Sequence, residues 1–193
     1  MVDLGKPLQI RRIAAEETAV TDAAWRLLNR AQGDGLFGRD YVARHSDGEQ
    51  GITVGAWRAD VLVGVGCAEL LTGLDYYLPF ESGITARLAG ERVGSLCTLA
   101  VEEHCRGQGI GQQLGRARLA WLRERGCTTV LAVSWLSGLA HTSDRVFEKL
   151  GFEGGKTVPA FYRADALKHP FDCPGCRQVP CACAARLYEY RFV

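Results

Sequence analysis

The sequence predicts a single α/β domain, and three observations support this prediction. Short apolar segments typical of strands alternate along the chain with segments whose apolar residues recur at helical spacing. Turn-forming glycine, proline and polar residues separate them, and no internal repeat or linker divides the chain. The 193 residues, 47% of them hydrophobic, are enough for one domain (1–193) with a full core.

The chain begins with a predicted strand and a predicted helix. Apolar and polar residues alternate imperfectly in "PLQIRRIAA" at 7–15, which is typical of a strand. Between 16 and 32, Val20 and Leu27 lie on one helical stripe, and the glycine-rich stretch 33–38 ends this helix.

Three further strands follow. "GITVGAWRADVLVGVGCAELL" at 51–71 predicts two strands joined by a tight turn. Residues 72–90 have no regular pattern and contain several aromatic residues, so we expect a mobile flap over a pocket. "RVGSLCTLAV" at 92–101 predicts the next strand, and a sharp turn comes directly after it.

A long amphipathic helix is predicted between residues 109 and 125. Ile110, Leu114 and Trp121 lie on its apolar face, while its arginines, among them Arg118, are expected to point outward. "TTVLAVSW" then predicts a buried strand and "TSDRVFEKL" a helix. "VPAFYRA" at 158–164 and "ARLYEYRFV" at 185–193 are the last two predicted strands.

Charge and hydropathy exclude several classes of function. The net charge is +1 and acidic and basic residues are interleaved, so neither nucleic acid nor an anionic membrane is an expected partner. No stretch approaches the ~18 apolar residues of a membrane span. The first residues lack the features of a signal peptide, which favours the reducing cytoplasm. A homodimer remains open.

Of three glycine-rich stretches, only "RGQGIG" at 106–111 has the context of an anion site. A strand enters it and an amphipathic helix leaves it, so glycine amides at the positive end of the helix dipole can approach a phosphate. Arg106 adds a positive charge. "GDGLFG" at 33–38 follows a helix instead of a strand, and "GGKT" at 154–157 lacks the first glycine of a P-loop.

The stretch "LAVEEHCRGQGIGQQLGRARLAWLRERG" resembles the acetyl-CoA-binding motif of the GNAT acyltransferases, and "RVFEKLGF" resembles the segment that follows in that superfamily. The resemblance implies a mixed, mostly antiparallel sheet flanked by helices. It also implies acetyl-CoA as co-substrate and a primary amine as acceptor, which attacks the thioester directly. Backbone groups of Leu99, Ala100 and Val101 would bind the pantetheine arm. The pyrophosphate would lie on Arg106, Gly107, Gln108, Gly109, Ile110 and Gly111.

The groups that move protons in the family are missing at three matching positions. Phe147 replaces the tyrosine acid, Ala140 an asparagine, and Ala132 a glutamate base. His141 and Glu91 are the substitutes that we predict as catalytic residues, because His141 precedes the last helix and Glu91 shares strand parity with Cys97. Solvated surface positions are the alternative for both. A buried strand thiol such as Cys97 is usually inert, which argues against an acyl-enzyme.

Four of the eight cysteines lie close together near the C-terminus. Short spacings of this kind can close four thiolates around one zinc ion in a small knuckle (170–184) between the last two strands. Free thiols, disulfides and an iron–sulfur centre remain alternatives. With four protein ligands the zinc has no open position and is structural, so we predict a closed Zn²⁺ site on Cys173, Cys176, Cys181 and Cys183.

The sequence therefore predicts an N-acetyltransferase that uses acetyl-CoA. A non-catalytic acyl-CoA-binding module is the rival, favoured by the missing acid and base at Phe147 and Ala132.

Overall fold

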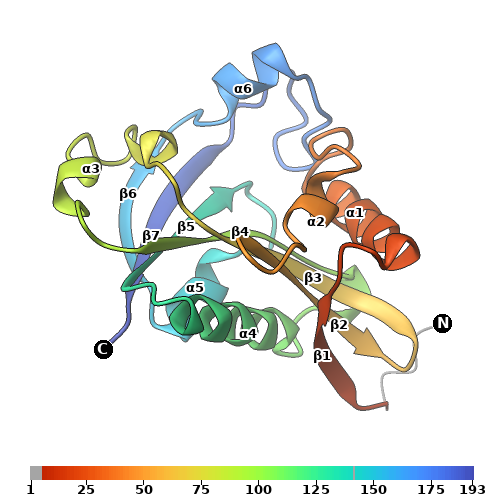
Figure 1. Cartoon of the computed structure of the whole chain (residues 1–193). Coiled ribbons are helices and arrows are strands. Elements are labelled where there is room, and N and C mark those ends of the chain that lie inside the picture. Colours follow the sequence, from red (N-terminus) through yellow and green to blue (C-terminus); the bar gives the residue numbers. More distant parts are fainter. Residues whose placement is uncertain (1–5, 141) are drawn as a thin grey trace.

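The computed structural model describes residues 6–140 and 142–193. Within them, one seven-stranded sheet has the order β1-β2-β3-β4-β5-β7-β6 (Figure 1). The strands are β1 (Leu8–Ile13), β2 (Gly51–Arg58), β3 (Val61–Leu70), β4 (Val93–Val101), β5 (Thr129–Leu136), β6 (Glu153–Val158) and β7 (Ala184–Arg191).

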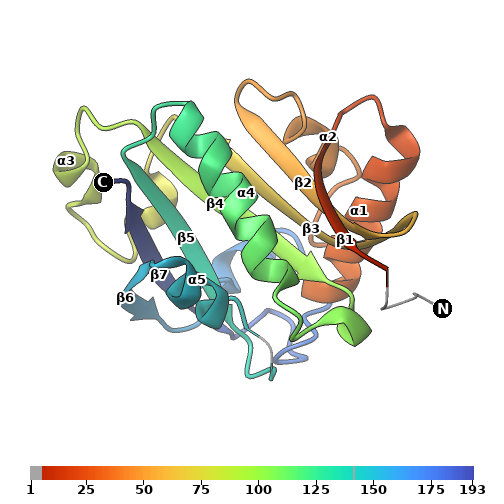
Figure 2. The ribbon, with the colours of Figure 1, turned by 90° about the horizontal axis from the view of Figure 1, so that it is seen from below.

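Helices cover both faces of this sheet. The first two helices lie on one face, and α4 and α5 lie on the other (Figures 1 and 2). No helix among the described residues combines the length and apolar content needed to cross a bilayer. The helices are α1 (Thr18–Gln32), α2 (Tyr41–Arg44), α3 (Ile84–Arg87), α4 (Ile110–Glu124), α5 (Asp144–Leu150) and α6 (Arg163–Lys168), with short 3₁₀ turns at Asp75–Tyr77 (η1) and Glu103–Cys105 (η2).

Strand pairing confirms the mixed, mostly antiparallel sheet. Every neighbouring pair is antiparallel except β4 and β5, which run parallel. The β4–β5 pairing begins at Val93 with Thr129 and ends at Leu96 with Ala132. Both strands continue beyond this point, so they part in the second half of β4.

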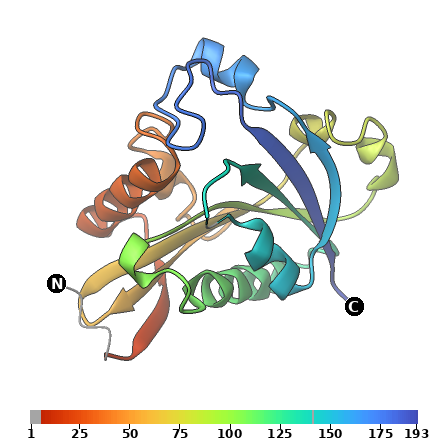
Figure 3. The same cartoon turned by 180° about the vertical axis from the view of Figure 1, so that it is seen from behind.

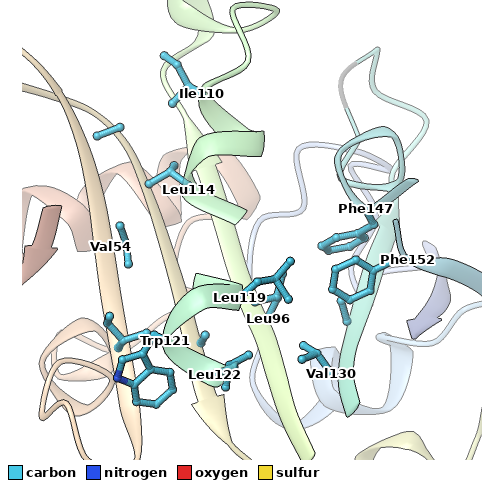
Figure 4. Close-up of a cluster of buried hydrophobic side chains, with 14 of the residues drawn as sticks. Val54, Leu96, Ile110, Leu114, Leu119, Trp121, Leu122, Val130, Phe147 and Phe152 are labelled. Carbon is cyan, nitrogen blue, oxygen red and sulfur yellow. The ribbon is translucent and has the colours of Figure 1, made fainter. Parts of the chain in front are cut away.

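The largest core cluster lies between the sheet and the α4–α5 face (Figure 4). Leu114 of α4 is fully buried there, as the helical pattern predicts, and so is Leu122. Leu96 of β4 and Val130 of β5 pack against them from the sheet. Burying such side chains contributes about 1.5–3 kcal/mol each, so this cluster fixes α4 against the strands that part beside it.

Arg118 corrects the prediction for the outer face of α4. Its side chain is 1% exposed, and the guanidinium donates to the carbonyl oxygens of Leu114, Cys67 and Thr98 at 2.8–3.1 Å. Gly66 makes room for it, because a Cβ there would lie 2.8 Å from the guanidinium carbon. Burial lowers the pKa of Arg118 to about 10, so the side chain keeps its charge at neutral pH.

One predicted strand is absent, and the segment predicted to be a mobile flap contains short helical turns. The predicted strand at 158–164 is wrong, because β6 ends at Val158 and α6 follows it. Phe161 instead stacks beside Phe80, with ring centroids 4.7 Å apart. Residues 72–90 contain η1 and α3, and the side chains of Tyr77 and Phe80 are buried in a third core cluster.

Candidate active site

The turn between β4 and α4 presents two glycines to open space. Gly107 and Gly109 both have φ of 78°, a backbone region that L side chains rarely adopt. A Cβ at either position would meet nothing within 4 Å. The first amides of α4 have no acceptor within the helix and lie at its positive end, so the turn offers N–H donors to an anion.

The third glycine has a packing role. At Gly111, a Cβ would lie 3.2 Å from Val146 of α5 and 3.4 Å from Leu99 of β4. The small residue therefore lets α4 start close to both neighbours. Arg106 is held at the turn by a 3.0 Å hydrogen bond from its Nε to the carbonyl oxygen of Val101.

Backbone groups of alternate residues in β4 point away from β3. The amide of Glu102 donates to the carbonyl oxygen of Val63, and Ala100 pairs with Val65 in the same register. Because antiparallel pairs alternate, Leu99 and Val101 turn their polar groups toward the space left by β5, whereas Ala100 turns its own toward β3.

The carbonyl oxygens of Leu99 and Val101 both have side-chain donors. Gln32, at the end of α1, donates its amide to Leu99 at 2.9 Å, and Arg106 bonds Val101. A ligand that pairs with this edge must therefore displace or bridge the Gln32 side chain. Ala100 has a core position under α1, where it is 3% exposed.

A β-bulge lies where the two strands part. Cys67 pairs with Thr98 but its neighbour Ala68 pairs with Leu96, so Cys97 is the extra residue. Leu96 is also the last residue of β4 that pairs with β5. The bulge therefore marks the closed end of the space between β4 and β5.

Beside this bulge lies a polar group that sequence reasoning missed. His45 follows α2, Glu69 lies near the end of β3, and Cys97 is the bulge residue; one ligand atom from each lies within 4.8 Å of the others. The imidazole Nε2 is 3.4 Å from Oε2 of Glu69, and Nδ1 is 2.8 Å from the carbonyl oxygen of Tyr41. No spacing motif links these residues, so only the strand pairing could have indicated them.

The two partners shift each other's protonation. Burial of the ring is the largest single influence and lowers the pKa of His45. The hydrogen bonds to Glu69 and Tyr41 together raise this pKa by more, so the net shift is upward. The bond from His45 lowers the pKa of Glu69. Burial raises the pKa of Cys97 well above its ordinary value, so this thiol stays neutral.

The two predicted catalytic residues remain predictions. Glu91 lies before β4, about 30 Å of strand away from the glycine turn. It accepts hydrogen bonds from Thr129 and Thr128 and an ion pair from Arg191 at 3.3 Å; the first of these is the main reason that its pKa is lowered. These contacts join β4, β5 and β7. His141 lies outside the described residues.

Phe147 and Ala132, which stand where the family has its acid and base, lie in buried apolar surroundings. Phe147 is 3% exposed, and its ring packs against Phe152 and Tyr188 at centroid distances of 5.3 and 5.4 Å. Ala132 is fully buried in the same core cluster.

The four C-terminal cysteines converge on one point. Their sulfur atoms lie within 4.8 Å of one another, with separations of 3.5 Å, 3.7 Å and 3.8 Å for three of the pairs. A tetrahedron with Zn–S bonds of ~2.3 Å has sulfur–sulfur edges of about 3.8 Å. All four thiols are free of disulfides, so the donor set and its spacing fit a zinc ion held by Cys173, Cys176, Cys181 and Cys183.

Backbone donors favour the thiolate form of one member of this cluster, Cys176. The amide of Ala182 donates to the sulfur of Cys176 at 3.4 Å. Burial raises the pKa of the Cys176 thiol. The hydrogen bond from Ala182 and the further hydrogen bonds to this sulfur outweigh the effect of burial and lower the pKa to about 6. A thiolate is the form that binds a metal.

The knuckle joins two parts of the molecule at one end of the sheet. A Cβ on Gly175 would lie 2.7 Å from Ser137, which follows β5. On the other side, Asp172 forms a bridge with Asp34 after α1, and Gly33 leaves room for Phe171. The C-terminal loops and the end of α1 lie side by side in Figures 1 and 3. The loop 33–38 therefore contacts the chain just before the knuckle.

A pocket of about 670 Å³ lies between α1 and the knuckle. Its α1 wall includes Trp25, Asn29 and Arg30, and its knuckle wall includes Pro174 and Arg177. Because α1 ends at Gln32, which bonds Leu99, the pocket lies close to the free edge of β4.

Comparisons with known proteins agree with this architecture. The sequence matches the model of the acetyltransferase (GNAT) family over residues 8–152. No curated protein matches the sequence significantly.

Several solved structures resemble the fold. Mosquito arylalkylamine N-acetyltransferase like 5b is 16% identical with a TM-score of 0.70, covering 96% of this chain and 100% of that one. The ribosomal-protein-S18-alanine N-acetyltransferase of Escherichia coli is 15% identical (TM-score 0.63; 96% and 94%). The Drosophila melanogaster polyamine N-acetyltransferase, which forms N-acetylagmatine, is 14% identical (TM-score 0.63; 96% and 100%). At these identities the likeness concerns the fold alone.

Proposed function

The chain belongs to the acetyltransferase (GNAT) family, and from this premise we propose that it transfers an acetyl group from acetyl-CoA to a primary amine. One observation carries the proposal. The edge of β4 that β5 leaves, with Leu99 and Val101 facing the parted strands, is followed after the short turn η2 by the glycine turn at the start of α4.

These parts match the two ends of the co-substrate. The pyrophosphate carries charge that suits Arg106 and the amides of residues 107–111. The pantetheine arm contains amide groups that suit the backbone of Leu99 and Val101, which no strand pairs on this side, once the arm displaces or bridges the side chain of Gln32. We assign Ala100 no backbone contact, because its polar groups face β3.

The reaction needs little from the protein once both substrates are aligned. The amine nitrogen attacks the thioester carbon, a tetrahedral intermediate forms, and its collapse breaks the carbon–sulfur bond. A thiol of ordinary pKa, ~8.5, leaves readily as a thiolate. The absence of a hydroxyl at Phe147 is therefore compatible with turnover.

The second candidate is an acyl-CoA-binding module without catalysis. The buried aromatic packing of Phe147 and the alanine at 132 favour it. The two candidates differ in one measurement, the release of free CoA from acetyl-CoA in the presence of amines. The names of the similar structures suggest the acceptors to test: an arylalkylamine, for which we choose tryptamine, agmatine, and a peptide with N-terminal alanine.

We also propose that the knuckle holds one structural zinc ion, because four thiols at these separations fit its tetrahedron and leave no open position. When bound, the ion would tie together the loop around Cys176. A site of reduced thiolates suits the cytoplasm. We treat 1–193 as one domain with the knuckle 170–184 inserted between β6 and β7.

The test of the proposed function combines binding and turnover. In isothermal titration, Arg106→Glu should lose CoA affinity at least about tenfold, because a carboxylate would then face the pyrophosphate. Arg123→Glu makes the same charge change on an exposed residue at the far end of α4, about 20 Å away, and should bind like the wild type. Undiminished affinity in Arg106→Glu would refute the cradle.

A further inference from the structure

Where β4 leaves β5, the structure gathers polar side chains around the bulge residue Cys97. The closed end of the space between the strands is where a thioester reaching down the β4 edge would end. His45 and Glu69 lie next to this point and come from different elements. Glu69 pairs with Ser95, so its side chain lies on the face of the sheet opposite to that of Leu96, which packs toward α4.

We propose that His45 is the base that takes the proton of the acceptor ammonium, and that Glu69 positions its ring and leads the proton to water. This inference rests on the proposed acetyl transfer and adds the residue that prepares the amine. Glu91 and His141, the candidates predicted from sequence, are not needed for this step.

The ring is held in one tautomer. Nδ1 lies 2.8 Å from the carbonyl oxygen of Tyr41, which can only accept, so Nδ1 carries a proton. In the neutral ring, Nε2 then has the lone pair and can accept a proton. This nitrogen is the one that lies 3.4 Å from the carboxylate of Glu69.

Burial separates the roles of the two partners. The side chain of His45 is 13% exposed, so it is sheltered and kept in place, while that of Glu69 is 41% exposed and reaches water. A proton on Nε2 therefore has an immediate partner in the carboxylate and a route to solvent beyond it. The same carboxylate attracts the positive charge of an incoming ammonium.

The other titratable groups around the pair do not compete for the proton. Burial raises the pKa of Tyr41, Tyr77 and Cys97, so all three remain neutral donors. Arg44 has its own partner in Asp40, at 2.8 Å on the exposed side of α2. Glu69 is thus the ionised group that sets the proton affinity of His45.

The protons balance in this scheme. The ammonium gives one proton to Nε2, and the neutral amine forms the carbon–nitrogen bond while the carbon–sulfur bond breaks. The second nitrogen proton leaves the intermediate and neutralises the departing thiolate. Imidazolium returns its proton to water past Glu69, so each turnover yields the amide, CoA thiol and one released proton.

His45→Gln tests the base directly. General bases contribute about 10²–10⁴-fold, so CoA release should fall at least about a hundredfold while CoA affinity stays at the wild-type value. His169→Gln changes an exposed histidine of the same chain and should retain wild-type rates. A His45→Gln enzyme within threefold of the wild type would overturn the inference and leave the proposed function intact.

Glu69→Gln tests the positioning role through the pH profile. Glu69 raises the pKa of His45, so removing the charge lowers that pKa and the neutral ring persists to lower pH. The acid limb of kcat/KM should move to lower pH, which loss of packing would not cause. NMR titration of the His45 ring should show the same downward shift without substrate.

The outcomes separate the two hypotheses. An unmoved acid limb and an unmoved ring titration in Glu69→Gln would overturn the inference alone. A wild-type protein that binds acetyl-CoA but releases no CoA with tryptamine, agmatine or the alanyl peptide would overturn the inference together with the proposed function.

Discussion

Gly109 offers a test of the glycine turn in which backbone strain and ligand contact can be measured separately. The substitution is Gly109→Ala. The residue has φ of 78° and caps α4, and the added methyl group would meet no protein atom within 4 Å. Its effect on the free protein therefore comes from the left-handed backbone and not from a clash.

The size of that effect follows from two opposing terms. An L-residue in the left-handed region lowers the free energy of unfolding by about 1–2 kcal/mol. Alanine also lowers the entropy of the unfolded chain, which raises the free energy of unfolding by about 0.4–1 kcal/mol. The net loss is on the order of 1 kcal/mol, or about 2–4 °C in melting temperature for a chain of this size. The methyl group also occupies the open space before the first amides of α4, so CoA should bind at least about tenfold more weakly.

Gly90→Ala is the matched control. Gly90 has φ of 81°, and a Cβ there also meets nothing within 4 Å, but it lies at the other end of β4. Thermal unfolding without ligand and calorimetric titration with CoA measure both quantities. We expect both variants to lose a similar amount of stability. Only Gly109→Ala should also lose affinity for CoA. Equal CoA affinity in the two variants would refute an anion site at this turn.

Two further predictions concern the cysteine knuckle and the pH dependence of folding. Cys176→Ser should lower the melting temperature and the zinc content, and change the acceptor KM more than the affinity for acetyl-CoA; an unchanged melting temperature with full metal content would contradict a structural zinc. The raised pKa of His45 means that its ion pair with Glu69 stabilises the fold fully below the unfolded pKa of about 6.5, and that this contribution is lost as the pH rises through the folded pKa. Urea unfolding should therefore show a larger deficit for His45→Gln at pH 5.5 than at pH 9, and a deficit independent of pH would contradict the pairing.

The sequence predicts well those elements whose own residues determine them. Helix α4 has a complete apolar stripe between Ile110 and Trp121, and its glycine turn has a strand before it, so both follow from local pattern. The cysteine cluster likewise follows from spacing, because Cys173 and Cys183 are close along the chain.

What the sequence does not reveal depends on tertiary contacts. The helical pattern alone assigns Arg118 to the solvated face of α4, whereas the bulge at Cys97 leaves carbonyl groups that need a donor and draws the side chain inward. His45 and Glu69 are brought together only by the pairing of β2 with β3, which sets Gly51 opposite Glu69, and by the placement of α2, which sets His45 against Gly51. The strand β6 is rich in glycine and gains its order from β7.

The last strand, β7, lies between β5 and β6, and this order affects how the chain folds while the ribosome is still making it. β5 pairs along its whole length with β7, yet Leu136 at the end of one is made long before Ala184 at the start of the other. At 5–20 residues per second, this interval lasts about 2–10 s. During that time the nascent chain carries "TVLAVSWL" with an unpaired edge, the kind of segment that invites association with other chains. Molecular chaperones that bind apolar segments have this interval in which to act.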